Sequence, residues 1–184
     1  MNTRQVKRNI RTVLCSRSVH GLISKIGLAV VIRLPIFAKA TIMQQSDILL
    51  VDDSSEVAEL TQYAILRKKL TKNWKWFSDA EHASDFLFRH EYIARRDLHP
   101  CLILMDLHMP RLSGHDLLRM LKGNKATSHI PVVMFSTSTD REDIRRSYEL
   151  GANGYLEKSI DADKLMDTVV DTVSYWTTRN LSAR

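Results

Sequence analysis

The stretch Ile48-Leu49-Leu50-Val51-Asp52-Asp53 joins a continuous apolar run to two adjacent carboxylates. An apolar run without polar alternation is typical of a strand that is buried on both faces of a parallel sheet. Two further runs of this kind follow at 101–105 and 132–135. The first of them also ends at an aspartate, Asp106, and the second ends at Ser136. The pattern predicts parallel strands whose carboxyl ends carry polar groups.

Helix signals separate these strands from one another and from two shorter ones, at 73–77 and 153–157. Five strand–helix pairs in strict alternation predict an α/β fold, a doubly wound (βα)5 unit with a five-stranded parallel sheet. The helix starts are predicted at Ser54 or Ser55, at the capping-box sequences 78–81 and 139–142, at Ser113 and near Asp161.

Each predicted helix turns apolar residues to one face at helical spacing. In chain order these are Val57, Leu60, Ala64 and Leu66, then Ala83, Phe86, Leu87 and Ile93, then Leu117, Leu118 and Leu121, and finally Leu165, Val169, Val173 and Trp176. Gly151 suits the end of the helix that starts within 139–142.

The charge of the chain is unevenly distributed. Of 184 residues, 27 are Lys or Arg and 21 are Asp or Glu, a net charge of +6. Residues 1–46 hold eight of the basic residues and no acidic one, so residues 47–184 carry 19 basic and 21 acidic residues, a net charge of −2. The basic excess therefore belongs to the first quarter of the chain, and it says little about the partners of the rest.

Residues 1–46 allow several interpretations. Their apolar run 26–32 is too short for a membrane span, which needs about 20 apolar residues. A signal peptide would use Ala38-Lys39-Ala40 as its cleavage site, but charges interrupt the apolar region. A membrane-surface segment is another option. A fourth is a disordered or non-native extension, with translation starting at Met43. The two cysteines, Cys15 and Cys101, exclude a disulfide scaffold and a structural zinc site.

Five polar residues stand at the predicted carboxyl ends of strands: Asp52, Asp53, Asp106, Ser136 and Lys158. Loops at this edge of a parallel sheet converge, so we expect the three carboxylates, the hydroxyl and the ammonium to lie close together. Clustered carboxylates repel unless a cation joins them. Oxygen ligands favour Mg²⁺, and a lysine opposite them can hold a phosphoryl oxygen. The site predicts phosphoryl chemistry with an aspartate as nucleophile.

The residues at these strand ends resemble the receiver domain of two-component response regulators. The resemblance covers residues 47–176, leaves 177–184 as a tail, and implies a flavodoxin-like fold. Residues 146–153 and the stretch around Trp74 are similar to stand-alone receivers that serve phytochrome-type kinases. The motifs that carry the resemblance are Asp52-Asp53, Asp106 within 104–110, Gly114, Ser136, Tyr155 and Lys158, with steps of 30 residues from Asp106 to Ser136 and 22 from Ser136 to Lys158.

The resemblance implies a role for each acidic residue. Asp106 would be the phosphoacceptor, taking a phosphoryl group from a kinase phosphohistidine. Asp53 and Asp106 would bind Mg²⁺ through their side chains, Asp52 through water and His108 through its backbone carbonyl. All seven histidines, His108 and His115 among them, are expected at the surface and not as side-chain ligands.

The resemblance also implies a switch. Lys158 would hold the phosphoryl oxygen, Ser136 would turn its hydroxyl toward the aspartyl phosphate, and Tyr155 would turn inward into the space that opens. The family usually has a proline after this lysine, in a cis peptide, whereas this chain has Ser159. A cis bond before a residue other than proline costs about 2.5–4 kcal/mol, so this peptide is expected to be trans or strained.

We therefore expect a cytoplasmic single-domain response regulator, a phosphoprotein and not an enzyme. Its partners would be a sensor histidine kinase or histidine phosphotransfer protein and a downstream protein target, without a DNA-binding output domain, and a homodimer is left open. One alternative is a Mg²⁺-dependent phosphohydrolase using Asp106, although phosphatases of the haloacid dehalogenase type carry a second aspartate where this chain has His108. Another is a nucleic-acid or membrane adaptor acting through residues 1–46.

Overall fold

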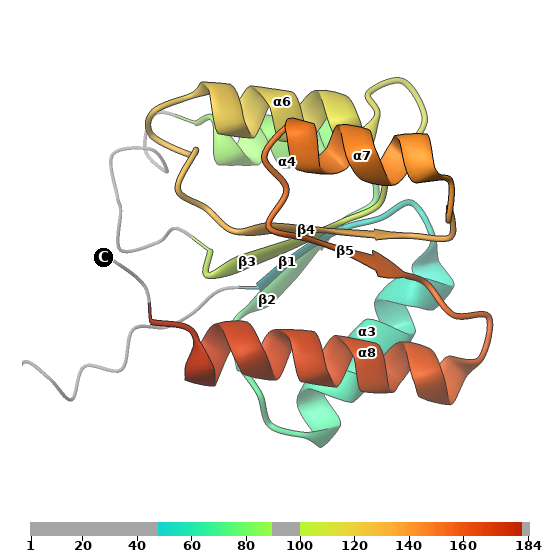
Figure 1. The fold of residues 1–184 in the computed structure, drawn as a ribbon. Helices are drawn as coiled ribbons and strands as arrows, with labels where there is room; N and C mark the ends of the chain where they lie inside the picture. The colour runs from blue at the N-terminus through green and yellow to red at the C-terminus, as the bar shows by residue number, and fades with distance from the viewer. Residues whose placement is uncertain (1–47, 90–99, 182–184) are drawn as a thin grey trace, which may run out of the picture. The chain divides into compact units, whose positions relative to one another are not determined.

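The computed structural model describes residues 48–89 and 100–181. Five parallel strands form one sheet in the order β2-β1-β3-β4-β5 (Figure 1). Their bounds are β1 Ile48–Val51, β2 Trp74–Phe77, β3 Leu102–Met105, β4 Val132–Ser136 and β5 Gly154–Glu157. This confirms the predicted doubly wound (βα)5 fold with its five-stranded parallel sheet.

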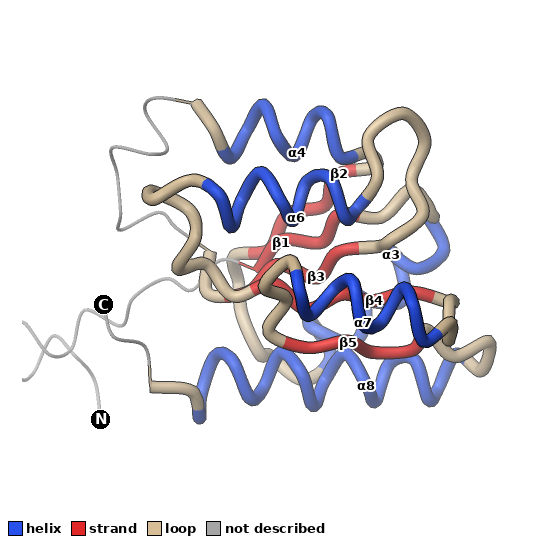
Figure 2. Tube along the Cα trace, turned by 45° about the horizontal axis from the view of Figure 1, so that its top comes forward, coloured by secondary structure: helices blue, strands red, loops and turns tan. Residues whose placement is uncertain are grey.

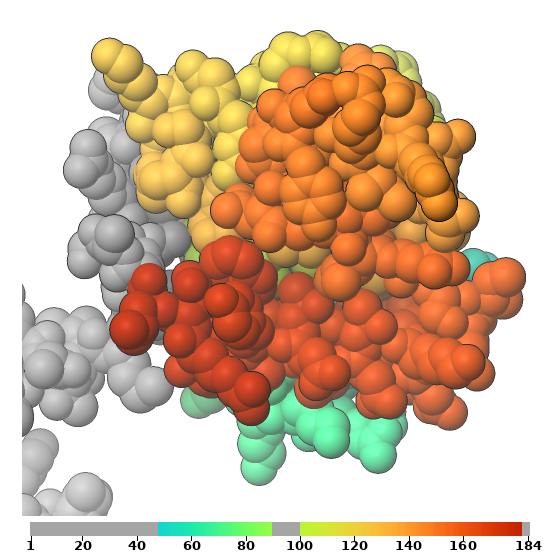
Figure 3. Space-filling view, viewed as in Figure 1, coloured from blue at the N-terminus to red at the C-terminus, as the bar shows by residue number. Residues whose placement is uncertain are grey.

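Helices cover both faces of the sheet, with α4, α6 and α7 on one face and α3 and α8 on the other (Figures 1 and 2). The space-filling view from the same side shows α7, in orange, above α8, in red (Figure 3). The bounds are α3 Ser55–Arg67, α4 Ala80–Leu87, α6 Gly114–Gly123, α7 Arg141–Glu149 and α8 Ala162–Ser174.

A side-chain oxygen caps the start of each of these helices by accepting a backbone N–H. The predicted cap Ser113 is confirmed, Ser54 is the cap of the two serines offered for α3, and the helix predicted from about Asp161 is capped by that residue. In the two capping-box sequences the prediction was off by one residue, because Asp79 and Asp140 cap α4 and α7 in place of the preceding Ser78 and Thr139. An aspartate competes well for this position because its carboxylate also interacts favourably with the helix dipole.

Two apolar clusters pack on the two faces of the sheet. One joins the sheet to α4 and α6, and the other joins it to α3 and α8. Leu66 was predicted to face inward but is 55% exposed, because the buried face of α3 runs through Ala58, Ala64 and Ile65. Ile93 lies outside the described residues.

The ends of two helices depart from simple helical spacing. The helix α8 ends at Ser174 and continues as a π-helical segment, Tyr175–Arg179, in which Trp176 packs against the second apolar cluster. Gly151 follows α7 with a φ of +95°, the left-handed conformation expected of a glycine beyond a helix end. Among the described residues no helix is both long and apolar enough to cross a bilayer.

Candidate functional site

The register of the sheet brings the predicted site residues to one edge. Val51 pairs with Met105 across β1 and β3, so Asp52 and Asp106 follow at the same level of the sheet. The strand order reverses between these two neighbours, which is where ligands bind in doubly wound sheets. Ser136 pairs with Glu157 across β4 and β5, and the amide of Lys158 donates to the Ser136 carbonyl at 2.8 Å.

A buried ion-pair cluster forms the centre of the site. The Nζ atom of Lys158 lies 2.7 Å from Oδ2 of Asp52 and 2.9 Å from Oδ1 of Asp106. Asp52 is fully buried, and Asp106 and Lys158 are 6% and 7% exposed. One ammonium thus bridges two carboxylates inside the protein, at the ends of three different strands.

The surroundings of Asp52 disfavour its charge. Burial raises the pKa of this carboxyl from 3.8 to about 6, although Lys158 and the amide of Ser54 both act to lower it. The Ser54 amide donates to Oδ1 at 3.1 Å. Oδ2 is buried and lies 2.7 Å from the Lys158 ammonium. This buried carboxylate therefore depends on one ammonium and one backbone amide for its polar contacts.

This arrangement fits a divalent cation. Asp52, Asp53 and Asp106 each offer one carboxylate oxygen, and the three atoms all lie within 4.8 Å of one another. Asp53 is exposed, so the cluster opens to solvent on one side. Hard oxygen donors, two of them from neighbouring strand ends, suit Mg²⁺ or Mn²⁺. Asp52 and Asp106 share a single ammonium, so a further positive charge beside the three carboxylates would be favourable.

A glycine allows the loop after β3 to fold back onto the site. A Cβ atom built on Gly114 would lie 2.0 Å from the carbonyl oxygen of Asp106, a distance that no side chain tolerates. The Gly114 amide also donates to the Leu107 carbonyl at 3.0 Å. Gly114 therefore sets the path of the backbone around Asp106 through the absence of its side chain.

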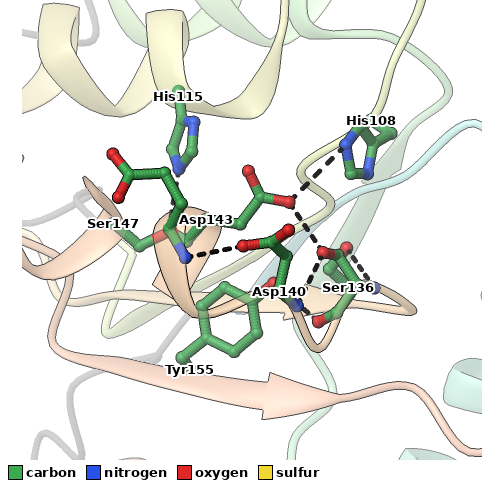
Figure 4. Close-up of polar contacts among 9 residues, drawn as sticks. His108, His115, Ser136, Asp140, Asp143, Ser147 and Tyr155 are labelled. Atoms are coloured by element: carbon green, nitrogen blue, oxygen red, sulfur yellow. Dashed lines mark hydrogen bonds and ion pairs between the residues drawn. The ribbon is translucent and has the colours of Figure 1, made fainter. Parts of the chain in front are cut away.

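Ser136 and Tyr155 meet at a third residue, Ser138. Ser136 is fully buried, and its Oγ accepts the Ser138 amide at 3.2 Å. The hydroxyl of Tyr155 donates to the Ser138 carbonyl at 2.9 Å, and burial raises the pKa of Tyr155. Figure 4 shows Tyr155 directed toward the loop that follows Ser136. The two residues predicted to switch are thus joined through one loop residue.

The two histidines near the site differ in exposure. The side chain of His108 is 65% exposed, with Nε2 3.9 Å from Oδ2 of Asp143 (Figure 4). His115 was predicted at the surface, but it is buried between α6 and α7, where Nε2 lies 2.9 Å from Oγ of Ser147. That surface prediction was wrong because a buried polar partner removes the cost of burying an imidazole.

Sequence reasoning missed three residues that contact the site residues. Trp76 was assigned only to a strand, but its indole N–H donates to the Asp52 carbonyl at 2.7 Å. Ser138 and Asp143 form a 2.6 Å hydrogen bond beside Ser136. Their polar residue types in a loop and a first helical turn are too common to single them out. The Lys158–Ser159 peptide is trans, one of the two forms expected from the sequence.

Comparison with known proteins agrees with this geometry. Residues 48–170 match the family described as response regulator receiver domain. The probable methanogenesis regulatory protein FilR2 of Methanothrix harundinacea is 37% identical over 129 residues, covering 70% of this chain and 82% of that protein. Response regulator Rcp1 of Synechocystis sp. is 35% identical over 130 residues, covering 70% of this chain and 87% of Rcp1.

Two solved structures are similar in both fold and sequence. The Mn²⁺-bound form of Rcp1 has a TM-score of 0.68 and 32% identity, and the match covers 76% of this chain and 99% of that one. The phosphorylated cyanobacterial phytochrome response regulator RcpA has a TM-score of 0.69 and 30% identity, with the same coverage of 76% and 99%.

Proposed function

The chain belongs to the response regulator receiver domain family of two-component systems, and from that membership we propose that it accepts a phosphoryl group on Asp106. Receiver domains are phosphoacceptor regulators that histidine kinases phosphorylate, and relatives include the phytochrome-associated regulators Rcp1 and RcpA. The observation that carries the assignment to Asp106 is the 2.9 Å contact of its Oδ1 with Lys158 Nζ, beside two further carboxylates.

The contacts of Asp106 suit it to the role of nucleophile. An Asp106 carboxylate oxygen attacks the phosphorus atom of a phosphohistidine, the P–N bond breaks, and its electron pair stays on the imidazole nitrogen. Lys158 already lies beside Asp106 and carries the positive charge that a phosphoryl oxygen requires. Asp52 is fully buried and held by Lys158 and Ser54, so the less buried Asp106 is the better placed to receive the group.

Mg²⁺ is the cation that we assign to the acidic cluster. Asp53 and Asp106 would hold it through their side chains, Asp52 through water and His108 through its backbone carbonyl. When bound, the ion would neutralise negative charge on the phosphoryl oxygens. The exposure of Asp53 and the solvation that Mg²⁺ retains in proteins support a site that opens to water.

We assign the switch to Ser136 and Tyr155. The Ser136 hydroxyl would donate to the aspartyl phosphate, and Tyr155 would take its inward position as that bond forms. The bonds of both residues to Ser138 support this coupling. On this proposal the chain acts as a regulator: phosphorylation changes the surface that it presents to a protein target, and no substrate is turned over.

The partners proposed are a sensor histidine kinase or a histidine phosphotransfer protein and a downstream protein target. A homodimer, a cytoplasmic location and the division into residues 1–46, 47–176 and 177–184 remain predictions.

The phosphohydrolase alternative gains no support at its key position, because the exposed His108 stands where such enzymes carry their second aspartate. The adaptor alternative depends on residues 1–46, which lie outside the described residues.

Labelling with acetyl phosphate and Mg²⁺ tests the proposal. Intact-mass spectrometry is expected to show one added phosphoryl group on the wild type and none on Asp106→Asn. Asp116→Asn is the matched control, because Asp116 lies on α6 nearby but pairs with Arg119. Equal labelling of the wild type and Asp106→Asn would refute the assignment. Continued release of phosphate with many turnovers would favour the phosphohydrolase.

A further inference from the structure

The β4–α7 loop, residues 137–140, is tied to α7 by a hydrogen bond that the proposed function does not use. The hydroxyl of Ser138 donates to Oδ2 of Asp143 at 2.6 Å, the length typical of a bond from a hydroxyl to a carboxylate. Asp143 lies in the first turn of α7. Its side chain is 30% exposed, so the bond lies at the boundary between the site and solvent.

Every polar group of Ser138 is engaged. Its amide donates to Ser136 Oγ at 3.2 Å, its carbonyl accepts from Tyr155 at 2.9 Å, and its own Oγ accepts the Asp140 amide at 3.3 Å. Ser138 is therefore the residue through which the positions of Ser136 and Tyr155 depend on each other. Anything that fixes Ser138 also orients the hydroxyl of Ser136, which keeps its own proton for donation while it accepts.

The backbone of Asp143 is held in turn by Ser147 and, through Ser147, by His115. The hydroxyl of Ser147 donates to the backbone carbonyl of Asp143 at 2.8 Å, and Nε2 of His115 on α6 lies 2.9 Å from the same hydroxyl. Because the single Ser147 proton goes to Asp143, His115 donates to Ser147. Burial lowers the pKa of His115, which favours its neutral form in this position. Ser147 is the buried residue of α7, so its contact with His115 fixes the position of α7 against α6.

We propose that Asp143 is a positioning residue that, through Ser138, holds Ser136 in the orientation needed to bind a phosphoryl group on Asp106. The chain of contacts runs from α6 through His115, Ser147 and Asp143 to the β4–α7 loop (Figure 4). A loop that is already ordered loses less conformational entropy when the phosphoryl group binds. This inference rests on the proposed function, because it concerns the same reaction on Asp106.

Binding of beryllofluoride, a stable mimic of the phosphoryl group, tests the proposal in the presence of Mg²⁺. Ser138→Ala removes the donor of this hydrogen bond, and Asp143→Ala removes its acceptor. Each variant is expected to bind beryllofluoride about two- to tenfold more weakly, which corresponds to the free energy that one hydrogen bond contributes. The double variant is expected to bind no more weakly than either single one, because both remove the same interaction. Affinity for Mg²⁺ alone is expected to stay unchanged in all three.

Two matched variants separate positioning from a general structural effect. Ser138→Thr retains the hydroxyl and is expected to bind beryllofluoride like the wild type. Glu142→Ala removes another carboxylate from the first turn of α7, one that pairs with Arg145, and is expected to have no effect. Additive losses, an equal loss in Glu142→Ala, or a matching loss of Mg²⁺ affinity would each overturn the proposal.

Amide hydrogen exchange tests the hydrogen bond between Asp143 and Ser138 independently of phosphoryl binding at Asp106. In the free protein, Asp143→Ala is expected to speed exchange of the Ser138 amide, which donates to Ser136, while Glu142→Ala leaves it unchanged. A wild type that fails to bind beryllofluoride would refute the function at Asp106. Unchanged exchange of the Ser138 amide in Asp143→Ala would refute the proposal that Asp143 positions Ser138.

Discussion

Two groups of ion pairs in this domain use the same residue types in opposite surroundings. At the centre of the site, Lys158 bridges Asp52 and Asp106, and all three side chains are almost completely buried. On α7, Arg145 bridges Glu142 and Glu149, and all three side chains are more than half exposed. Solvent screens the second group fully but reaches the first group only at its edge, so the charges should matter to stability mainly in the first.

The comparison also shows that the buried group does not add to the free energy of unfolding through the charge of Asp52. Burial raises the pKa of Asp52 even with an ammonium 2.7 Å away, so keeping this carboxylate ionised costs folding free energy. Strongly shifted pKa values of this kind are frequent at functional sites, which is consistent with the proposed binding of a cation and a phosphoryl group here. The exposed group on α7 carries no such cost.

The largest effect is expected from removing the buried ammonium. Lys158→Met leaves Asp52 and Asp106 facing each other without a counter-charge and is expected to lower the free energy of unfolding by about 3 kcal/mol at pH 7 without Mg²⁺. Urea denaturation measures the change. Lys164→Met, at an exposed position on α8, is the control and should leave the urea midpoint unchanged. Equal midpoints for the two variants would contradict the role given to burial.

A smaller loss is expected when the backbone around Asp106 is displaced without a change of charge. Gly114→Ala places a Cβ against the Asp106 carbonyl oxygen and is expected to cost about 1–3 kcal/mol, with loss of phosphorylation by acetyl phosphate. Gly123→Ala on the same helix meets no atom within 4 Å and should retain the stability and labelling of the wild type. Normal labelling of Gly114→Ala would show that the site tolerates this displacement.

Neutralising Asp52 is expected to stabilise the protein. Because the pKa of Asp52 is about 6 in the folded state and 3.8 when exposed, the folded state binds the proton more tightly. Its contribution to stability therefore falls as the pH rises from about 4 to about 6 and then levels off. Asp52→Asn should remove this step and gain on the order of 2 kcal/mol at pH 7 in metal-free buffer. Thermal denaturation from pH 4 to pH 8 measures it, and an unchanged pH profile would contradict the assignment.

The smallest effect is expected on the exposed group. Arg145→Ala breaks the contacts with Glu142 and Glu149, but water and salt already screen them. The midpoint of urea denaturation should stay within experimental error of the wild type at physiological salt. A loss as large as that of Lys158→Met would mean that exposure is not what separates the two groups of ion pairs.

Much of the fold could be predicted because it depends on local patterns. Uninterrupted apolar runs mark β1, β3 and β4, and polar caps mark the helix starts, since both follow from the residues nearest in the chain. The predicted positions of Asp52, Asp106, Ser136 and Lys158 at strand ends are confirmed by the register. The errors at Leu66 and His115 have one origin, because burial depends on what packs opposite a residue, which a helical period does not specify.

By itself, the sequence determined the alternation of strands and helices, the parallel sheet and the set of polar groups at its edge. Each of these follows from the residue types and their spacing along the chain. Only the tertiary structure decided that Lys158 joins Asp52 to Asp106 and that Asp143 reaches Ser138. Those contacts depend on distances of a few ångströms between elements far apart in the chain, which packing of the helices against the sheet sets.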